Sequence, residues 1–251
     1  MNYGLIGEKL GHSYSKLIHE KLADYTYDLC PLSREEFQIF MSEKKFIAIN
    51  VTIPYKRDVI PYLTTIDEKA KRIKAVNTIV NHEGQLIGYN TDYDGFAYTL
   101  KKHRIEITNK KVLVLGNGGA AQAVLAVLED LNASEIIIVK YKQEEGTVTY
   151  EEAALLHNDA SLIVNTSPIG MYPNIEACPI DLTPYNHLDA VIDLIYNPTT
   201  TRFMEQAIKK NVLAVNGLEM LIAQAKHAVE HFLSIEIEDN EIDRIYQELF
   251  D

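Results

Sequence analysis

The sequence predicts an α/β protein with two domains, one of them a doubly wound parallel sheet. Short apolar runs alternate with amphipathic segments, a pattern typical of βα units. Continuous apolar runs, such as KVLVL at 111–115, predict strands buried on both faces, as parallel strands are. The length of 251 residues fits one large domain or two small ones. The change in character between the halves predicts a boundary near residues 103–110.

The first half is expected to alternate strands with helices. A strand at 46–51 ends before Pro54, because proline has no N–H for a ladder hydrogen bond. The His82-Glu83-Gly84 segment has turn chemistry and joins two strands into a hairpin. The expected strands are 3–6, 46–51, 75–80 and 85–89, and the expected helices are 15–23, 56–63 and 91–103.

The second half is expected to hold the parallel sheet. Its second crossover is short and lacks a full helix, so we expect an abbreviated connection there. The expected strands are 111–115, 135–139, 161–164, 190–194 and 214–216, and the expected helices are 120–131, 217–233 and 240–250.

Composition limits the classes of partner. The chain has 24 Lys and Arg against 36 Asp and Glu, and its net charge of −12 repels nucleic acid. No stretch approaches the roughly 20 apolar residues that span a bilayer, and the N-terminus lacks a secretory signal pattern. Cys30 and Cys178 are too few for a disulfide framework. We therefore expect a cytoplasmic protein that acts on small molecules, with no nucleic-acid or membrane partner.

A glycine cluster, Gly116-Asn117-Gly118-Gly119, lies between a buried strand and an amphipathic helix. Glycines let the backbone approach a pyrophosphate, and free N–H groups at the helix start meet its charge. Ala121 holds the last position of G-x-G-x-x-G, where alanine is an accepted variant. A plain tight turn is the alternative, but the context favours dinucleotide binding and hence a Rossmann-type domain.

Three further polar segments stand where a predicted strand gives way to a helix. Thr52 and Lys56 belong to one, Asp92 to another, and Ser13 and Ser15 to the third. Each has an ordinary explanation: a surface lysine, a carboxylate in a first helical turn, or a helix N-cap. Together they predict a ligand site, because open α/β sheets bind ligands at such edges.

Eight motifs run in order along nearly the whole chain and are highly specific when taken together. They are HSYS (12–15), NVTIPYK (50–56), AVNT (75–78), GYNTDYDG (88–95), GNGGAA (116–121), NTSPIGM (165–171), DLIYNP (193–198) and GLEMLIAQA (217–225). With these motifs the chain resembles the shikimate dehydrogenase family.

The resemblance implies a reaction and a set of ligands. Family members reduce 3-dehydroshikimate to shikimate with NADPH, on the route through chorismate to aromatic amino acids. Ser13 and Ser15 would hold the substrate carboxylate, and its ring and hydroxyls would meet Thr52, Lys56, Asn77, Asp92, Tyr196 and Gln224. The pyrophosphate would lie on Gly116, Asn117, Gly118, Gly119 and Ala120, with Leu194 and Gly217 at the nicotinamide end. The family's C-terminal helices return to the first domain, which assigns 1–103 with 218–251 to substrate and 104–217 to NADP.

Reducing a ketone needs a hydride from the nicotinamide and a proton for the developing alkoxide. A lysine near that oxygen can donate the proton or stabilise the negative charge. We therefore expect Lys56 and Asp92 to form one catalytic unit. Whether Lys56 acts as a base in shikimate oxidation or only as an electrostatic clamp stays open.

The chain departs from the family pattern at four places. Lys16 replaces a proline, Lys74 a glycine, and Glu219 the second glycine of GLGML. The fourth departure follows the second strand of the second domain, where the family has an Asn-Arg-Thr motif and a further arginine for the 2′-phosphate of NADP. Here Lys140 and Lys142 stand in a stretch without arginine. They could meet the phosphate as point charges, more weakly than an arginine fork.

Two other functions remain open at this point. The first is a shikimate/quinate dehydrogenase that uses NAD, because the segment expected to bind the 2′-phosphate is altered. Against it, no Asp or Glu stands at the end of the strand, where an NAD-selective site would have one. The second is a non-catalytic relative that binds shikimate-like acids. The presence of both Lys56 and Asp92 argues against it, because a pure binding protein does not need a proton-transfer pair. His227 and His231 are four residues apart on a predicted helix, and no third metal ligand accompanies them. We therefore expect no metal site and expect both histidines to be exposed to solvent. A monomer or homodimer is expected.

Overall fold

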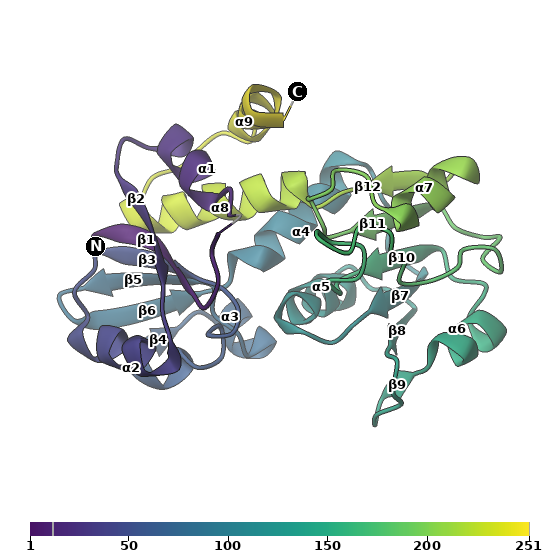
Figure 1. Ribbon diagram of the computed structural model, residues 1–251, viewed down its shortest axis with the longest axis horizontal. Helices are drawn as coiled ribbons and strands as arrows, with labels where there is room; N and C mark the ends of the chain where they lie inside the picture. Colours follow the sequence, from purple (N-terminus) through teal and green to yellow (C-terminus); the bar gives the residue numbers. More distant parts are fainter. Residues whose placement is uncertain (12, 251) are drawn as a thin grey trace. The chain divides into compact units, whose positions relative to one another are not determined.

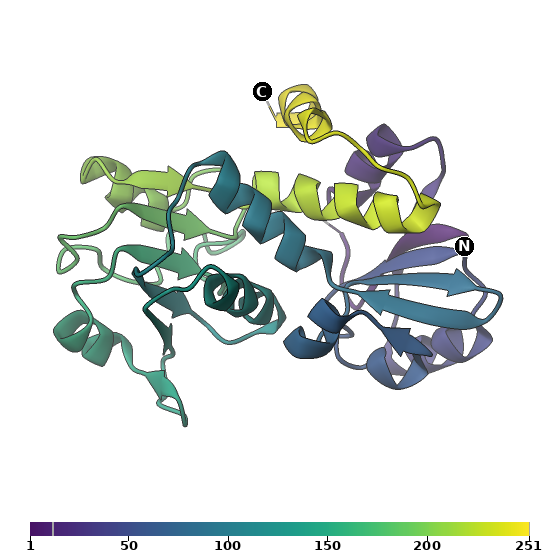
Figure 2. The ribbon, with the colours of Figure 1, turned by 180° about the vertical axis from the view of Figure 1, so that it is seen from behind.

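The computed structural model describes residues 1–11 and 13–250, which form two compact units (Figures 1 and 2). Residues up to Phe96 and from Leu221 on belong to the first unit, and Ala97–Met220 form the second. The chain passes between the units inside two helices, α4 (Thr91–Lys102) and α8 (Leu218–Leu233). The limits expected from the sequence stand at residues 103 and 218, near the ends of these helices.

A six-stranded mixed sheet is the centre of the first unit. Its strands are β1 (Tyr3–Gly7), β2 (Tyr27–Pro31), β3 (Ala48–Val51), β4 (Thr65–Ile66), β5 (Thr78–His82) and β6 (Gln85–Tyr89). They stand in the order β2-β1-β3-β5-β6-β4. β5 is antiparallel to β3 and β6, and the other pairs are parallel. The carboxyl ends of β1, β3 and β6 and the amino end of β5 therefore lie at one edge.

Helices cover both faces of this sheet. The unit also holds α1 (Ser15–Leu22), α2 (Arg34–Glu43), α3 (Glu68–Ile73) and α9 (Asn240–Phe250). Ile6 packs with Phe37 of α2 in one apolar cluster, and Leu5 packs with Phe232 of α8 in another. Successive residues of a strand point to opposite faces, so α2 and α8 lie on opposite sides of the sheet (Figure 1).

The second unit has the predicted doubly wound parallel sheet. Its strands are β7 (Lys111–Leu115), β8 (Glu135–Val139), β9 (Thr147–Val148), β10 (Leu162–Asn165), β11 (Ala190–Asp193) and β12 (Leu213–Val215). They are all parallel, in the order β12-β11-β10-β7-β8-β9. Its helices are α5 (Gly119–Asp130), α6 (Tyr150–Leu156) and α7 (Arg202–Lys209). The direction of winding reverses at β7, which fixes a ligand crevice at the carboxyl end of that strand.

The crossover from β8 to β10 is abbreviated, as expected. It holds the two-residue strand β9 and the seven-residue helix α6. A capping box starts α6, since the Thr149 hydroxyl accepts from the Glu152 amide and the Glu152 carboxylate accepts from the Thr149 amide. Local capping therefore holds a helix of only two turns.

The predicted hairpin of β5 and β6 is confirmed. Glu83 and Gly84 have φ of 52° and 88°, and His82 pairs with Gln85 across the turn. Two successive positive φ values are typical of the tight turn that matches strand twist.

The helix expected at 56–63 is wrong. This segment forms turns that end in one 3₁₀ turn, Ile60–Tyr62. Pro61 lies inside it and has no N–H, so it cannot take part in a regular α-helical ladder. The segments that the sequence did not predict are β2, α2, β4, α3, β9, α6 and α7. No helix in the described residues is long and apolar enough to cross a membrane.

Candidate functional site

Lys56 and Asp92 form an ion pair in the first unit. Lys56 Nζ donates to Asp92 Oδ2 at 2.5 Å. Lys56 lies in the turns that follow β3, and Asp92 lies in the first turn of α4, directly after β6. Their side chains are 15% and 11% exposed, so solvent screens the pair only weakly. The topology of the sheet brings both to the edge where β3 and β6 end.

Asn77 stands beside this pair and orients the carboxylate. Its Nδ2 donates to Asp92 Oδ1 at 3.0 Å, while its Oδ1 accepts from the Thr91 amide at 2.8 Å. The Asn90 side chain accepts from the Asp92 amide at 3.1 Å. Asn77 is 3% exposed. Asp92 therefore has one oxygen on Asn77 and the other on Lys56.

Ser13 and Ser15 lie together at the start of α1. Ser13 Oγ donates to Ser15 Oγ at 3.0 Å and accepts from the Ser15 amide at 3.2 Å. Tyr14 is the N-cap and its side chain makes no cap hydrogen bond, so Ser15 is not the N-cap. Two hydroxyls at a helix start suit a carboxylate, since helix N-termini attract anions. His12 of the HSYS motif lies outside the described residues.

The remaining expected substrate ligands fall in both units. Thr52 follows β3, and its amide donates to the Ile6 carbonyl at 2.9 Å. Gln224 lies on α8 in the first unit, where its Nε2 donates to the Leu221 carbonyl at 2.8 Å. Tyr196 follows β11 in the second unit. Seven of the eight expected ligands thus belong to the first unit and one to the second.

The glycine loop joins β7 to α5 at the switch point of the parallel sheet. Gly116 has φ of 101°, a left-handed conformation that favours glycine. Gly118 is the N-cap of α5 and has no side chain. No side chain therefore caps the first amides of the helix, and a ligand can accept hydrogen bonds from them. Asn117 and Gly118 are exposed, and a Cβ on Gly118 would meet nothing within 4 Å. These features fit a dinucleotide pyrophosphate, with Gly119 and Ala120 opening the helix.

A buried carboxylate that the sequence did not single out ties the end of β10 to the loop after β11. Asp193 Oδ2 accepts from Thr201 Oγ1 at 2.6 Å, and Oδ1 accepts from Asn165 Nδ2 at 3.0 Å and from the Ile195 amide at 3.1 Å. Burial raises the pKa of Asp193 to about 6, although these donors oppose the shift. The sequence feature that could have identified Asp193 is its position in the DLIYNP motif, at the end of a predicted buried strand.

Leu194 and Gly217 come into close contact next to this carboxylate. The Gly217 amide donates to the Ile195 carbonyl at 3.0 Å. A Cβ on Gly217 would overlap the Leu194 carbonyl, so only glycine allows this approach. The two residues expected at the nicotinamide end are therefore neighbours in the second unit.

The segment after β8 has a charge arrangement that the sequence did not reveal. Lys140 forms an ion pair with Glu144, four residues later. Lys142 is exposed and has no ion-pair partner among the described residues. Tyr141 is 72% exposed and contacts the Tyr150 ring with centroids 4.9 Å apart. Glu144 thus offsets the charge of one of the two lysines expected to meet a 2′-phosphate.

The three single departures from the family pattern are accommodated locally. Lys16 Nζ donates to the Tyr27 carbonyl at 2.7 Å. Lys74 takes the left-handed conformation at the C-cap of α3, with φ of 57°. Glu219 Oε2 lies 2.5 Å from His103 Nε2, so it joins the start of α8 to the segment after α4 in the second unit.

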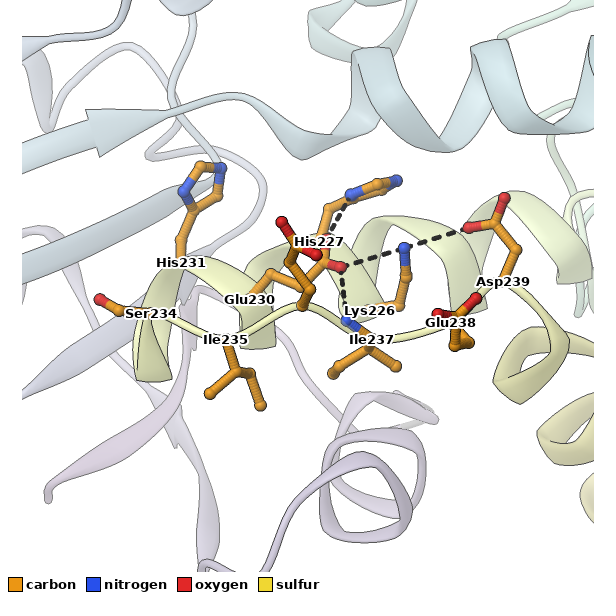
Figure 3. A pocket seen from close by; sticks show the side chains of 10 residues that line it. Lys226, His227, Glu230, His231, Ser234, Ile235, Ile237, Glu238 and Asp239 are labelled. Carbon is orange, nitrogen blue, oxygen red and sulfur yellow. Dashed lines mark hydrogen bonds and ion pairs between the residues drawn. The ribbon is translucent and has the colours of Figure 1, made fainter.

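A hollow of about 710 Å³ lies along α8 and the segment before α9 (Figure 3). Glu230 accepts from the Ile237 amide at 2.9 Å and lies 3.1 Å from Lys226 Nζ, and Lys226 also contacts Asp239 at 3.1 Å. These lining groups are paired with one another, so they fasten the loop to the helix.

The histidines of the H-x-x-x-H pair line the same hollow, and both are only partly exposed to solvent. His227 Nδ1 lies 2.7 Å from Glu230, and its side chain is 26% exposed. His231 stacks on Tyr89 with ring centroids 3.9 Å apart, and burial lowers its pKa. The described residues hold no group of three His, Cys, Asp or Glu side chains suited to a metal ion.

Comparisons with known proteins find sequence matches to one family. A family model described as the shikimate dehydrogenase substrate binding domain matches residues 5–79. A shikimate dehydrogenase (NADP(+)) of Clostridium beijerinckii is 38% identical over 261 residues, which cover 97% of this chain and 96% of that protein.

Two solved structures are also similar over nearly the whole chain. A chorismate mutase/shikimate 5-dehydrogenase fusion protein from Clostridium acetobutylicum matches with a TM-score of 0.92 and 39% identity, covering 98% of this chain and 96% of that one. Shikimate 5-dehydrogenase from Thermus thermophilus, in complex with NADP(H) and shikimate, matches with a TM-score of 0.88 and 26% identity, covering 99% of both chains.

Proposed function

The chain belongs to the shikimate dehydrogenase family, and we propose that it catalyses the reversible, NADPH-linked reduction of 3-dehydroshikimate to shikimate. The observation that carries this function is the shielded Lys56–Asp92 pair, held by Asn77 at the sheet edge. An ammonium beside a carboxylate suits a reaction that creates an alkoxide and moves one proton. The reaction is a step in chorismate and aromatic amino acid biosynthesis.

Each unit has its own part in this proposal. The first unit binds shikimate, with its carboxylate on Ser13 and Ser15 and its ring near Thr52, Asn77 and Gln224. The second unit binds NADP and contributes Tyr196 to the substrate. Gly116 to Ala120 hold the pyrophosphate, supported by the free amides at the start of α5. Leu194 and Gly217 border the nicotinamide.

The chemistry divides between the cofactor and the chain. When NADPH is bound it supplies the hydride to the carbonyl carbon. Lys56 Nζ donates the proton to the carbonyl oxygen, or stabilises its charge until a proton arrives. Asp92 directs the Lys56 ammonium through the hydrogen bond between Lys56 Nζ and Asp92 Oδ2. Asn77 fixes Asp92, so the group that handles the proton is ordered before substrate binds.

The cofactor is NADP, and we propose that Lys140 and Lys142 bind its 2′-phosphate. A lysine contributes a point charge where an arginine would form two parallel hydrogen bonds. No Asp or Glu stands at position 140, where an NAD-selective site would have one to accept from the ribose hydroxyls. The Lys140–Glu144 pair favours one alternative, a shikimate/quinate dehydrogenase that also uses NAD.

We expect Glu144→Gln to lower the KM for NADP about threefold and to leave the KM for NAD unchanged. The substitution frees the Lys140 ammonium, and exposed ion pairs of this kind are worth about 0.2–1 kcal/mol. Glu145→Gln is the matched control, because it removes the same charge from the same exposed loop. Equal effects of both variants, or equal effects on both cofactors, would contradict a specific role for Lys140.

The proposal as a whole is tested by shikimate oxidation, followed through nicotinamide absorbance with NADP and with NAD. Turnover that favours NADP is the expected result. Turnover that favours NAD would keep the reaction and reject the phosphate site. Binding of shikimate without turnover would make the chain a non-catalytic relative.

We also propose a cytoplasmic enzyme that acts on small molecules as a monomer or homodimer. Its two cysteines are free and partly buried, as in proteins of reducing compartments. Light scattering on the purified protein would measure the molar mass in solution and decide between the two states.

A further inference from the structure

Behind the Lys56–Asp92 pair lies a set of buried polar side chains that no step of the proposed reaction uses. Tyr27 and Thr78 are completely buried, and Asn50 is 5% exposed. Asn50 and Thr78 are cross-strand partners in the register of β3 and β5. Buried polar groups are costly unless they are hydrogen-bonded, so their arrangement calls for a physical reason.

The hydrogen bonds between these side chains run in one direction. The Tyr27 hydroxyl donates to Asn50 Oδ1 at 2.8 Å. Asn50 Nδ2 donates to Thr78 Oγ1 at 3.0 Å and to the Asn77 carbonyl at 3.2 Å. Thr78 Oγ1 then donates to Asn77 Oδ1 at 3.0 Å. The direction of each bond is set by the previous one. A hydroxyl has only one hydrogen, so Thr78 Oγ1, which accepts from Asn50, has its own hydrogen left to donate to Asn77.

The chain ends on the catalytic pair. Since Asn77 Oδ1 accepts from Thr78, the other end of the amide, Nδ2, faces Asp92 and donates to Oδ1. A flipped amide would place two acceptors together at Asp92 and two donors together at the Thr91 amide. Burial also raises the pKa of Tyr27 well above its usual value, so its hydroxyl remains a donor.

We propose that Tyr27, Asn50 and Thr78 are positioning residues, whose one-way hydrogen-bond chain fixes the Asn77 amide and thereby the Asp92 carboxylate against Lys56. This inference rests on the proposed function, because the group that it positions is the proton-handling pair. None of the three side chains hydrogen-bonds to Lys56 or Asp92 in the described structure, so they act through Asn77.

Thr78→Val tests the proposal because valine keeps the shape of threonine and removes its hydroxyl. We expect kcat for shikimate oxidation to fall about tenfold, with KM for shikimate changed less than twofold. Thr78→Ser restores the hydroxyl and is expected to return kcat to within about twofold of wild type.

A matched pair of tyrosine variants separates positioning from stability. The Tyr27 and Tyr55 hydroxyls are both buried and each donates one hydrogen bond, but Tyr55 donates to the Leu32 carbonyl at 2.6 Å, outside the chain. Each Phe variant loses one buried hydrogen bond, so similar losses of thermal stability are expected. We expect Tyr27→Phe to lower kcat about threefold and Tyr55→Phe to leave it unchanged.

Wild-type kcat in Thr78→Val and Tyr27→Phe, a loss of kcat that Thr78→Ser does not restore, or an equal loss in Tyr55→Phe, would overturn the positioning role. If Thr78→Val does not fold, the two tyrosine variants decide the question. A wild-type protein that binds shikimate without turnover would reject the proposed function. The positioning role would then be judged by crystal structures of the two variants, in which the Asn77 and Asp92 side chains should lose their order in Tyr27→Phe and keep it in Tyr55→Phe.

Discussion

Lys56→Ala is expected to lower kcat for shikimate oxidation by about a thousandfold. General acid–base groups contribute about 10²–10⁴ in rate, and Lys56 is the only residue to which the proposed reaction assigns the proton. Its side chain is 15% exposed, so water has little access to replace the ammonium. Steady-state kinetics with saturating shikimate and NADP would measure the loss, with circular dichroism to verify folding.

Asp92→Asn and the double variant show whether the pair acts as one unit. We expect Asp92→Asn to lose about a hundredfold, because the amide keeps the shape and removes the charge that directs Lys56. The double variant is expected to be about as slow as Lys56→Ala, since the Asp92 carboxylate acts on the proton transfer through Lys56. Losses that multiply to about 10⁵ would mean that the two residues contribute independently.

The same unit contains a control pair of the same chemistry. Lys69 Nζ lies 2.7 Å from Asp94 Oδ1, and Asp94 is in the same helix as Asp92. The Lys69 side chain is 50% exposed, so its contribution to stability is small. Lys69→Ala and Asp94→Asn should keep kcat within about twofold of wild type. A loss comparable to that of Lys56→Ala would point to a general charge effect.

The second unit was predictable because its strands are continuous apolar runs, and the central strands β7, β10 and β11 are buried. KVLVL at 111–115 and EIIIV at 135–139 form β7 and β8 with the expected ends. An unbroken apolar run between helical segments leaves few alternatives to a parallel strand. The glycine loop follows from the same logic, since it stands between such a strand and a helix.

The first unit was less predictable because its weaker elements depend on tertiary contacts. The sequence of β2, YDLCP, has a mixed burial pattern and a proline, so it shows neither alternation nor a continuous apolar run. It becomes a strand by pairing with β1 at the edge of the sheet. The sequence at 56–63 has helical spacing, but Pro61 limits it to a 3₁₀ turn.

Candidate site residues could be located at strand ends from the sequence, but their partners could not. Lys56 and Asp92 are 36 positions apart, and only the order of the strands brings them to one edge. The pairing of Lys140 with Glu144 depends on the local conformation after β8. Of the three donors on Asp193, one comes from the end of β10 and two come from the loop after β11. These contacts follow from register and loop geometry, which a pattern of residue types does not encode.

A buried histidine is expected to make the protein sensitive to acid. His19 of α1 is fully buried, stacks on Tyr27 with ring centroids 4.0 Å apart, and has Nδ1 2.8 Å from the Tyr25 hydroxyl. Its Nε2 has no hydrogen-bond partner in the described residues. Burial lowers the pKa of His19 to about 3, because the charged ring would lose its water.

The sign of the effect follows from where the proton binds. Below pH 6.5 the unfolded chain takes up a proton on His19, whereas the folded chain stays neutral down to about pH 3. The free energy of unfolding therefore falls with decreasing pH, with a slope that approaches about 1.4 kcal/mol per pH unit, and the loss between pH 6.5 and 4.5 is about 2 kcal/mol. Above pH 6.5 His19 makes no pH-dependent contribution.

His19→Phe isolates this contribution, because phenylalanine keeps a flat ring for stacking on Tyr27 and cannot bind a proton. Asp193 has the opposite sign, since its raised pKa of about 6 makes the folded state bind more protons. The difference between wild type and His19→Phe cancels that background. Urea unfolding at pH 6.5 and 4.5 should show the variant losing about 2 kcal/mol less than wild type. His82→Gln removes an exposed imidazole and should follow wild type; equal losses in wild type and His19→Phe would mean that His19 is protonated in the fold.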